Sequence, residues 1–460
     1  FKTNAALFTW LLVVGRAVGI KAASRLFVLL VLGVGAIAWP LFVLSFGGRR
    51  RMVVSAFFLW PMVHNWFVSM GMLDFALSVP LSALLLVGLN AQRQRPTTGR
   101  AVALSALAVA TWYAHVFSLL VVVLLAGLET ILRPKWSERR KLAKTLLGPL
   151  VPASVLAIVS IAAHFSERAG AMTGYVKLGS LLPPWELFYN LWSEWFYGFT
   201  WLEIATLVPC IGMGLWAIYR WRQDVPFFGP AALAVLSALY FFSPYVATNW
   251  FHVNSRIIPF LWLAALVRLP ERMPRRFFVV LGGCALTYAA GMGVDYVRLS
   301  RDWARFTAGM DAVPDGATLL PLVFQSKGVS ENTNSLLHAW GFYVIEKETS
   351  APLLFAHSKS FPVMYRSPPP PQFNHLVLES FAPRMATPAW ECDTLRSGGI
   401  ALDDCEGAWR SEWASFWRKA EPRFDHVLMW DAPQSVMSMV PDAYHATFQQ
   451  GELTILERRP

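Results

Sequence analysis

The sequence predicts a polytopic α-helical membrane protein of about ten spans, followed by a C-terminal outer α/β domain. Three observations predict this fold class. First, 55% of the 460 residues are hydrophobic and only 15% are charged, whereas an ordinary soluble domain carries about 25% charged residues. Second, the basic residues gather in short clusters between long apolar runs. Third, the composition becomes that of a soluble domain from Asp295 onward.

The charge is distributed unevenly along the chain. Residues 1–294 contain 25 basic and 9 acidic residues, whereas residues 295–460 contain 15 and 20, so the net charge of +11 comes from the apolar part. Five clusters hold 18 of those 25 basic residues, which is typical of loops on the cytoplasmic side of a membrane. We therefore expect membrane lipids as partners and no nucleic acid. The clusters lie at residues 49–51, 93–100, 133–144, 220–222 and 268–276.

A helix needs about 20 apolar residues to cross the hydrocarbon core of a bilayer, and residues 26–46 meet this requirement. About 40 residues separate the first two clusters, enough for two passes with a break near residues 64–71. Residues 101–132 are too long for one upright span and predict a hairpin of two short helices that turns near His115. The remaining spans are predicted at residues 146–165, 201–219, 227–246, 257–269 and 277–294.

Counting the passes predicts the sidedness of the whole chain. Residues 24–294 form the transmembrane domain, and residues 1–23 and 295–460 face the outside. Residues 5–19 are too short to span and are predicted to lie as a helix on the outer interface. The chain begins at Phe1 instead of methionine, which predicts a fragment or a processed product.

The outer domain, residues 295–460, alternates strand-like and helical patterns, which predicts an α/β or α+β domain. A closing pair of strands is joined by Gln-Gln-Gly-Glu, a hairpin signal. A loop is expected at the proline run 368–371. Strands are expected at residues 318–324, 353–356, 375–378, 427–430, 445–448 and 453–456, and helices at 303–312, 335–348 and 408–419.

Cys392 and Cys405 flank a 12-residue loop of the outer domain. An oxidising exterior would allow a disulfide between them. Without a nearby histidine, their spacing is a poor zinc signature, so no metal is predicted there.

Three segments carry a resemblance to a known family. The Asp74-led apolar helix that ends in Arg93, the break at Trp-Tyr-Ala-His around His115, and the Arg-x-x-Pro stretch of Arg256 and Pro259 at the start of a late span are similar to segments of the GT-C superfamily of membrane glycosyltransferases. The bacterial relatives of the protein O-mannosyltransferases and of the lipid A aminoarabinose transferase are the members it resembles. Relatives often carry a lysine where this chain has His115.

The resemblance implies an enzyme of the bacterial inner membrane. It would transfer a sugar from a polyprenyl-phosphate donor to a glycan, lipid or protein acceptor on the outer face, where the C-terminal domain also lies. The catalytic acid of the family usually lies in the first outer loop, and residues 1–23 contain no Asp or Glu. This implies either that the first span and loop lie upstream of Phe1 or that the chain is not a competent enzyme. A divalent metal cofactor is left open.

Asp74 and Arg256 are the main candidates for this chemistry. Asp74, near the outer end of its span, would act as the catalytic base; the alternative is a cap at the start of the helix. Arg256, beside His252 and Asn254, would grip the lipid phosphate bidentately. The alternative is an arginine that snorkels to lipid headgroups.

Other polar residues interrupt the apolar segments. His64 with Asn65, and His115, lie at the predicted hairpin turns and are candidate substrate-binding residues, or else structural hydrogen-bonding groups. In the aromatic outer loop 170–200, Glu186 or Glu194 could reach the site. That loop is alternatively an aromatic belt in the headgroup region.

Two other classes of function stay open. A lipid or glycan transporter would use broken helices of this kind, but no internal repeat is visible in the spans. A non-catalytic envelope scaffold would explain the missing first-loop acid.

Overall fold

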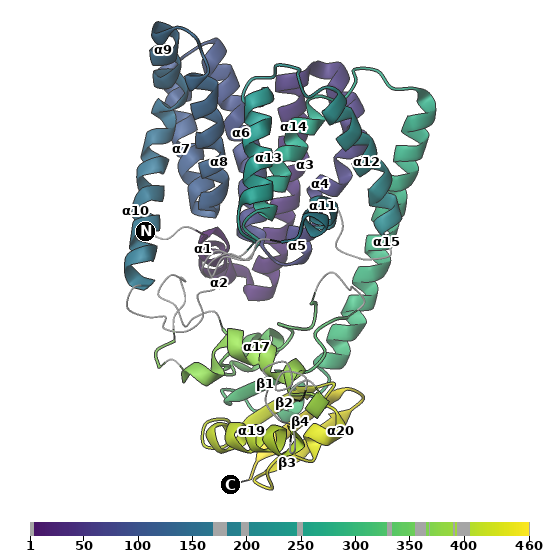
Figure 1. Ribbon diagram of the computed structural model, residues 1–460. Coiled ribbons are helices and arrows are strands. Elements are labelled where there is room, and N and C mark those ends of the chain that lie inside the picture. The colour runs from purple at the N-terminus through teal and green to yellow at the C-terminus, as the bar shows by residue number, and fades with distance from the viewer. Residues whose placement is uncertain are drawn as a thin grey trace. The chain divides into compact units, whose positions relative to one another are not determined.

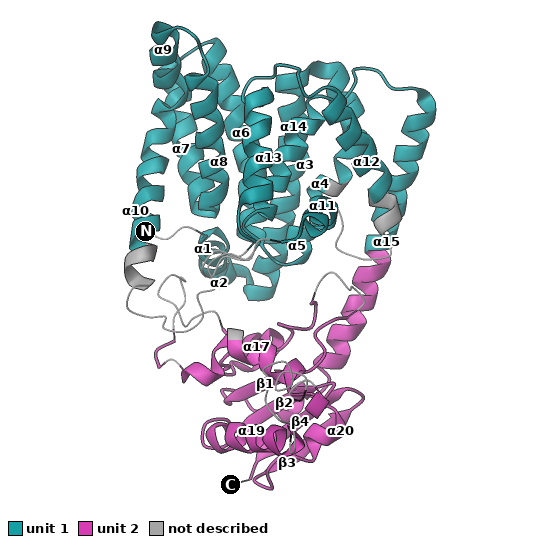
Figure 2. Cartoon of the chain, in the orientation of Figure 1, with its two compact units in different colours: residues 1–292 teal, residues 293–460 magenta. Residues whose placement is uncertain are grey.

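The computed structural model describes residues 4–168, 182–194, 202–245, 252–328, 334–354, 365–367, 369–389, 392 and 405–459 (Figure 1). The chain divides into two compact units, Phe1–Met292 and Gly293–Pro460 (Figure 2). This division lies two residues before the boundary expected at Asp295, where the composition turns polar. The helix Arg275–Phe306 contributes to both units.

The first unit is helical throughout its described parts. Its short elements lie at chain turns, and its long helices run side by side (Figure 1). The helices are α1 Ala6–Val13, α2 Gly15–Val18, α3 Ile20–Ser55, α4 Trp60–Val63, α5 Trp66–Ser69, α6 Leu73–Gln94, α7 Thr98–Ala114, α8 Val116–Ile131, α9 Trp136–Leu146, α10 Val151–Arg168, α11 Pro184–Ser193, α12 Glu203–Tyr219, α13 Pro230–Phe242, α14 Ile258–Leu266 and α15 Arg275–Phe306.

Four helical stretches among the described residues are long and apolar enough to cross a membrane, namely Ile20–Phe58, Leu73–Gln94, Trp136–Ala163 and Arg275–Ala312. Shorter apolar helices of 10 to 17 residues occur at Val116–Ile131, Leu207–Tyr219, Pro230–Phe242 and Ser255–Leu266. These lengths and compositions are those of a membrane domain. The helix lengths do not confirm the predicted number of ten membrane spans.

Several of these helices carry apolar side chains on their outer faces. On α10 and α12 such residues repeat at the i, i+4, i+7 spacing of one helix face, and each is more than half exposed. Apolar faces of this extent are unfavourable in water and are expected to contact lipid chains. The residues are Val151, Val155 and Ile158 on α10, and Ile211, Leu215 and Ile218 on α12.

The helix α3 contains the first predicted span and is bent at Gly48, whose φ of 80° is in the region that favours glycine. The chain then returns through a 3-10 turn, α4 and α5, which together replace the continuous second span expected before residue 64. The physical reason lies at His64 and Asn65. Both have extended backbones, and Asn65 Oδ1 accepts a hydrogen bond from Val68 N (3.3 Å), so a new helix begins there.

The hairpin predicted near His115 is confirmed. His115 has extended dihedral angles (φ −161°, ψ 122°) that end α7, and its Nδ1 accepts a hydrogen bond from Phe117 N (3.2 Å) at the start of α8. The two helices pack against each other and against α6 (Figure 1). The hydroxyl groups of Ser78 and Ser118, 2.6 Å apart, connect α6 to α8 in the core.

The five basic clusters meet at one end of this unit. Arg51 Nε donates to Leu269 O (2.6 Å), which joins the first cluster to the fifth. The Glu129 carboxylate pairs with Arg93 (3.2 Å) and Arg133 and accepts from Phe227 N (3.1 Å), which joins the second and third clusters to the turn after the fourth. The basic clusters therefore lie on one side of the helical unit, as the charge pattern predicts. The assignment of this side to the cytoplasm stays a prediction.

The second unit contains a four-stranded sheet of order β1-β2-β4-β3. β1 pairs parallel to β2, β2 pairs antiparallel to β4, and β3 and β4 form the predicted closing hairpin with Gly451 (φ 56°) in its turn. Every residue of β1 and β2 is buried, as expected for strands covered on both faces. The strands are β1 Leu319–Val323, β2 His426–Trp430, β3 Tyr444–Gln450 and β4 Leu453–Arg458.

The helices of this unit are α16 Gly341–Lys347, α17 His375–Arg384, α19 Cys405–Ala420 and α20 Gln434–Met437. The strand expected at 375–378 is wrong, because these residues form the first turn of α17. Leu378, Phe381, Ala382 and Met385 are buried at helical spacing, a period that the four-residue run alone does not show. Of the strand expected at 353–356, residues 353 and 354 lie in a turn, and 355 and 356 lie outside the described residues.

Three further expectations for this unit concern its disulfide, its helices and its proline loop. The disulfide between Cys392 and Cys405 is confirmed, with 5.3 Å between the Cα atoms. Helix 408–419 lies within α19, whereas 303–312 comprises the end of α15 and a 3-10 turn, and 335–348 contains the shorter α16. Pro368 of the predicted proline loop lies outside the described residues.

Glu379 of α17 gives the second unit a pH dependence. Burial raises the pKa of its carboxyl from 4.5 to about 7, and His338 Nδ1 lies 3.9 Å from its Oε1. A raised native pKa means that the folded state binds the proton more tightly than the unfolded state. The contribution of Glu379 to the free energy of unfolding should therefore fall as the pH rises from about 4.5 to about 7, by up to about 3 kcal/mol.

Hydrogen exchange of the sheet amides in the full chain, compared at each pH with Glu379→Gln, measures this effect. The variant should lose the pH dependence and protect the sheet more strongly at pH 8. Glu406→Gln, which changes an exposed carboxyl on α19, is the matched control and should leave the profile unchanged. The same pH profile in the wild type and in Glu379→Gln would contradict the assignment.

Candidate functional site

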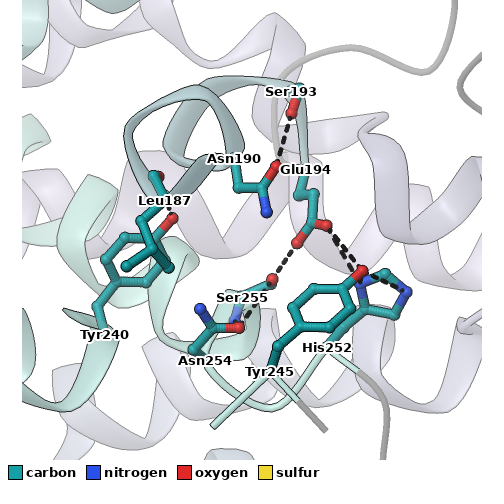
Figure 3. A network of polar contacts seen from close by, with 9 residues as sticks. All are labelled: Leu187, Asn190, Ser193, Glu194, Tyr240, Tyr245, His252, Asn254 and Ser255. Atoms are coloured by element: carbon teal, nitrogen blue, oxygen red, sulfur yellow. Dashed lines mark hydrogen bonds and ion pairs between the residues drawn. The ribbon is translucent and has the colours of Figure 1, made fainter. Parts of the chain in front are cut away.

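A network of polar side chains lies where the end of α11 meets the turn before α14. The carboxylate of Glu194 is its centre (Figure 3). Glu194 Oε1 accepts from Tyr245 OH (3.2 Å) and contacts His252 Nδ1 (3.2 Å), and Oε2 accepts from the hydroxyl of Ser255. Tyr245 OH also lies 2.6 Å from His252 Nδ1. A carboxylate that is only 8% exposed is thus fully engaged by protein groups.

The local sequence explains how this turn forms. His252 has a φ of 57°, a left-handed conformation. Asn254 Oδ1 then accepts from Ser255 N (2.9 Å), which begins the 3-10 turn Ser255–Ile257, and Pro259 stands in the first turn of α14. The network therefore holds the turn that carries Arg256.

Arg256 faces the start of α6. Its guanidinium carbon lies 5.7 Å from the centre of the Phe75 ring, a cation–π arrangement. Phe75 follows Asp74 in the first turn of α6, and its ring is 5.3 Å from that of His115. Two predicted site residues, Arg256 and His115, thus contact Phe75, the chain neighbour of the third, Asp74.

The break between α4 and α5 adjoins the same region. The Trp66 ring lies 4.7 Å from the His252 ring, and Phe67 lies 4.7 Å from Phe75. Asn65 caps α5 through Val68 N, and the backbone oxygen of His64 accepts from Tyr288 OH (3.2 Å). These contacts are structural, so His64 and Asn65 shape the break that presents the aromatic rings.

Asp74 contacts the N-terminal segment. Its Oδ1 accepts a hydrogen bond from Leu7 N (2.8 Å) in the first turn of α1. A carboxylate at this position satisfies a backbone donor and favours the positive end of the helix dipole. The Asp74 carboxylate thus caps the neighbouring helix α1 and not the start of its own helix. Its side chain is only partly buried.

Glu194 belongs to the network, whereas Glu186 makes no described hydrogen bond or ion pair with it and acts only through its charge on Tyr245. Glu186 is exposed in the first turn of α11, whereas Leu187, Asn190 and Glu194 follow one face of that helix and point inward. Glu194 lies seven residues after the buried Leu187, which places both on one face of a helix, whereas Glu186 directly precedes Leu187 and lies on another face. Helical spacing therefore favours Glu194 over Glu186 as the inward-facing carboxylate. Tyr245 and Ser255 had no signal in the sequence, because their role depends on where Glu194 lies.

Among the described residues, no group of three or more His, Cys, Asp or Glu side chains could hold a metal ion. The described groups of this region are the half-buried Asp74 carboxylate, the guanidinium of Arg256, the His115 ring and the buried Glu194 network. Such a set can accept a proton and neutralise an anion.

No protein-family model matches the chain, and no curated protein matches its sequence. Among solved structures, the chain is similar to the arabinofuranosyltransferase AftD from mycobacteria, determined by single-particle cryo-EM, with a TM-score of 0.45 and 13% identity. The similarity covers 98% of this chain and 35% of that one, so this chain spans about a third of the length of that protein. A similarity of this strength does not assign a family.

Proposed function

We propose that the protein is an integral membrane glycosyltransferase that transfers a sugar from a polyprenyl-phosphate donor to an acceptor on the outer face of the membrane. The observation that carries this proposal is the position of the Arg256 guanidinium over Phe75, the residue that follows Asp74. The cation proposed to bind the phosphate thereby lies against the residue that follows the proposed base, at the start of the same helix. The resemblance of these segments to the GT-C superfamily supports the same function.

The proposed reaction is a single displacement at the anomeric carbon. The acceptor hydroxyl loses its proton to the Asp74 carboxylate while its oxygen forms the new bond to that carbon. The bond from the carbon to the phosphate oxygen breaks on the opposite side, and its electron pair leaves with the phosphate. Arg256 neutralises the charge on the leaving phosphate. The product sugar has inverted configuration.

Glu194 is a positioning residue in this scheme, because it acts on Arg256 through Ser255 and His252. Replacing it with glutamine removes the charge and one of the two acceptor oxygens, so the Ser255 hydroxyl and the Tyr245–His252 pair can no longer both donate to this side chain. We expect Glu194→Gln to raise the KM for the lipid donor about tenfold or more, equivalent to about 1.4 kcal/mol of lost donor binding.

A double-mutant cycle tests this role. His252→Gln should weaken donor binding in the same way, and the double variant should be little worse than either single variant, because the two residues hold one turn. Glu138→Gln, which changes an exposed carboxyl on α9 at the basic end of the unit, is the matched control and should leave the KM unchanged. Strictly additive effects of Glu194→Gln and His252→Gln would show that they do not act as a unit.

The function itself is tested with the full chain in liposomes that contain labelled polyprenyl-phosphate sugars. The proposal expects label to move to an acceptor glycan, lipid or peptide, with release of polyprenyl phosphate. Movement of the intact lipid between leaflets without loss of its sugar would favour a transporter. If the chain neither transfers nor moves the lipid, the scaffold interpretation applies.

A further inference from the structure

A second polar site lies at the opposite end of the helical unit, among the basic clusters. A pocket of about 470 Å³ opens between the bend of α3 and the ends of α12 and α14. This volume is within the range of ligand sites, about 300–1,000 Å³. Five arginines and one glutamate line it, namely Arg50, Arg51, Arg220, Arg268, Arg272 and Glu271.

Two of these arginines build the walls. Arg268 is 1% exposed and donates to the backbone oxygens of Ala264 (2.9 Å), Gln223 (3.0 Å) and Phe228. Arg51 donates to Leu269 O, and its nearest carboxylate oxygen, on Glu271, is 3.9 Å away. Carbonyl groups orient and solvate a guanidinium without cancelling its charge, so the pocket keeps a positive field.

The other three arginines stand at the rim. Arg50, Arg220 and Arg272 are exposed, and the Arg220 guanidinium carbon lies 5.8 Å from the ring centre of Trp216, which also lines the pocket. Tyr219, beside it, is 73% exposed. Exposed aromatic residues paired with arginines are typical of the headgroup layer of a membrane.

We propose that this pocket binds the phosphate of an anionic membrane lipid. Five arginines and one glutamate line the pocket, so its net positive charge would attract the negative charge of a phosphate diester. The pocket also lies among the basic clusters, which anionic lipids attract to the membrane leaflet that contains them. The guanidinium groups at the rim would bind the phosphate oxygens, and the adjoining aromatic side chains would contact the glycerol and the first methylene groups. The site is separate from the Glu194 network and does not depend on the proposed transfer.

Native mass spectrometry of the full chain in detergent, titrated with phosphatidylglycerol or phosphatidylcholine, tests the proposal. Arg50→Gln with Arg272→Gln should weaken phosphatidylglycerol binding tenfold or more, because both rim cations are lost. Arg140→Gln with Lys141→Gln is the matched control. It removes the same charge from exposed residues of α9 that do not line the pocket, and it should weaken binding less than twofold.

The variants change exposed side chains, so each should retain the circular dichroism and thermal unfolding of the wild type. Phosphatidylcholine should bind at least tenfold more weakly than phosphatidylglycerol. Competition with glycerol phosphate separates the two sources of phosphate: a lipid site requires the lipid to bind much more tightly than the soluble ester. Equal affinity for lipid and ester, or equal losses in the pocket and control variants, would overturn the proposal.

Discussion

Replacing Asp74 with asparagine should lower sugar transfer by about 10²- to 10⁴-fold while the chain stays folded. The asparagine side chain keeps an oxygen that can accept the hydrogen bond from Leu7 N, so the cap on α1 is preserved. It cannot take a proton from an acceptor hydroxyl. The variant therefore removes the proposed role of Asp74 as a base and keeps its role as a cap of α1. Single-turnover transfer from a labelled lipid donor measures the chemical step.

Asp74→Ala is the companion variant. It removes both roles and should in addition destabilise the packing of α1 by about 1 kcal/mol, visible as a lower unfolding temperature than that of Asp74→Asn. Asp224→Asn, in the turn between α12 and α13 at the basic end of the unit, controls for the loss of one carboxylate. If Asp74→Asn transfers sugar at the wild-type rate, Asp74 serves only as a cap and another group is the base.

Removing the guanidinium of Arg256 should have an effect of similar size. Arg256→Ala is expected to lower transfer by about 10²- to 10³-fold, because the charge of the departing phosphate would develop without a cation to stabilise it. Arg256→Lys keeps the charge but loses the planar pair of donors, so its rate should lie between those of the wild type and the alanine variant. Both kcat and the KM for the donor should be measured.

The control for Arg256 is Arg222→Ala. This exposed arginine lies in the turn after α12, at the basic end of the unit, and its loss should leave transfer unchanged. Arg256→Ala should insert into the membrane as the wild type does, and its unfolding temperature should lie within a few degrees of the wild-type value. Loss of insertion in step with loss of transfer would mean that the arginine stabilises the fold through Phe75 and has no role in the reaction.

Hydropathy and charge predict the parts of the fold that depend on local sequence. The hairpin at His115 and the closing β-hairpin follow from patterns of a few residues, and the boundary expected at Asp295 follows from the composition of the long segments on either side. The errors occur where a short run fits two structures. Residues 375–378 look like a strand until the buried positions of the next turns reveal the helix. Residues 52–63 are mostly apolar and suggest one continuous helix, but they form the end of α3, a 3-10 turn and α4.

The sequence allowed several residues of the candidate site to be selected by their type, but it did not predict how their side chains are arranged. Arg256, His252 and Asn254 could be selected because polar groups are rare in apolar segments, but their roles could not be distinguished. Glu194 lies 58 residues before His252 and 61 before Ser255 along the chain, and no local pattern connects them.

The sequence by itself determined which segments are apolar, where charge collects and where helices break, because these properties arise from each residue and its near neighbours. Only the tertiary structure decided that Arg256 lies over Phe75, that Asp74 caps α1 and that five arginines surround one pocket. The physical reason is that such contacts join segments distant in sequence, and the packing of the helices sets the distances between them.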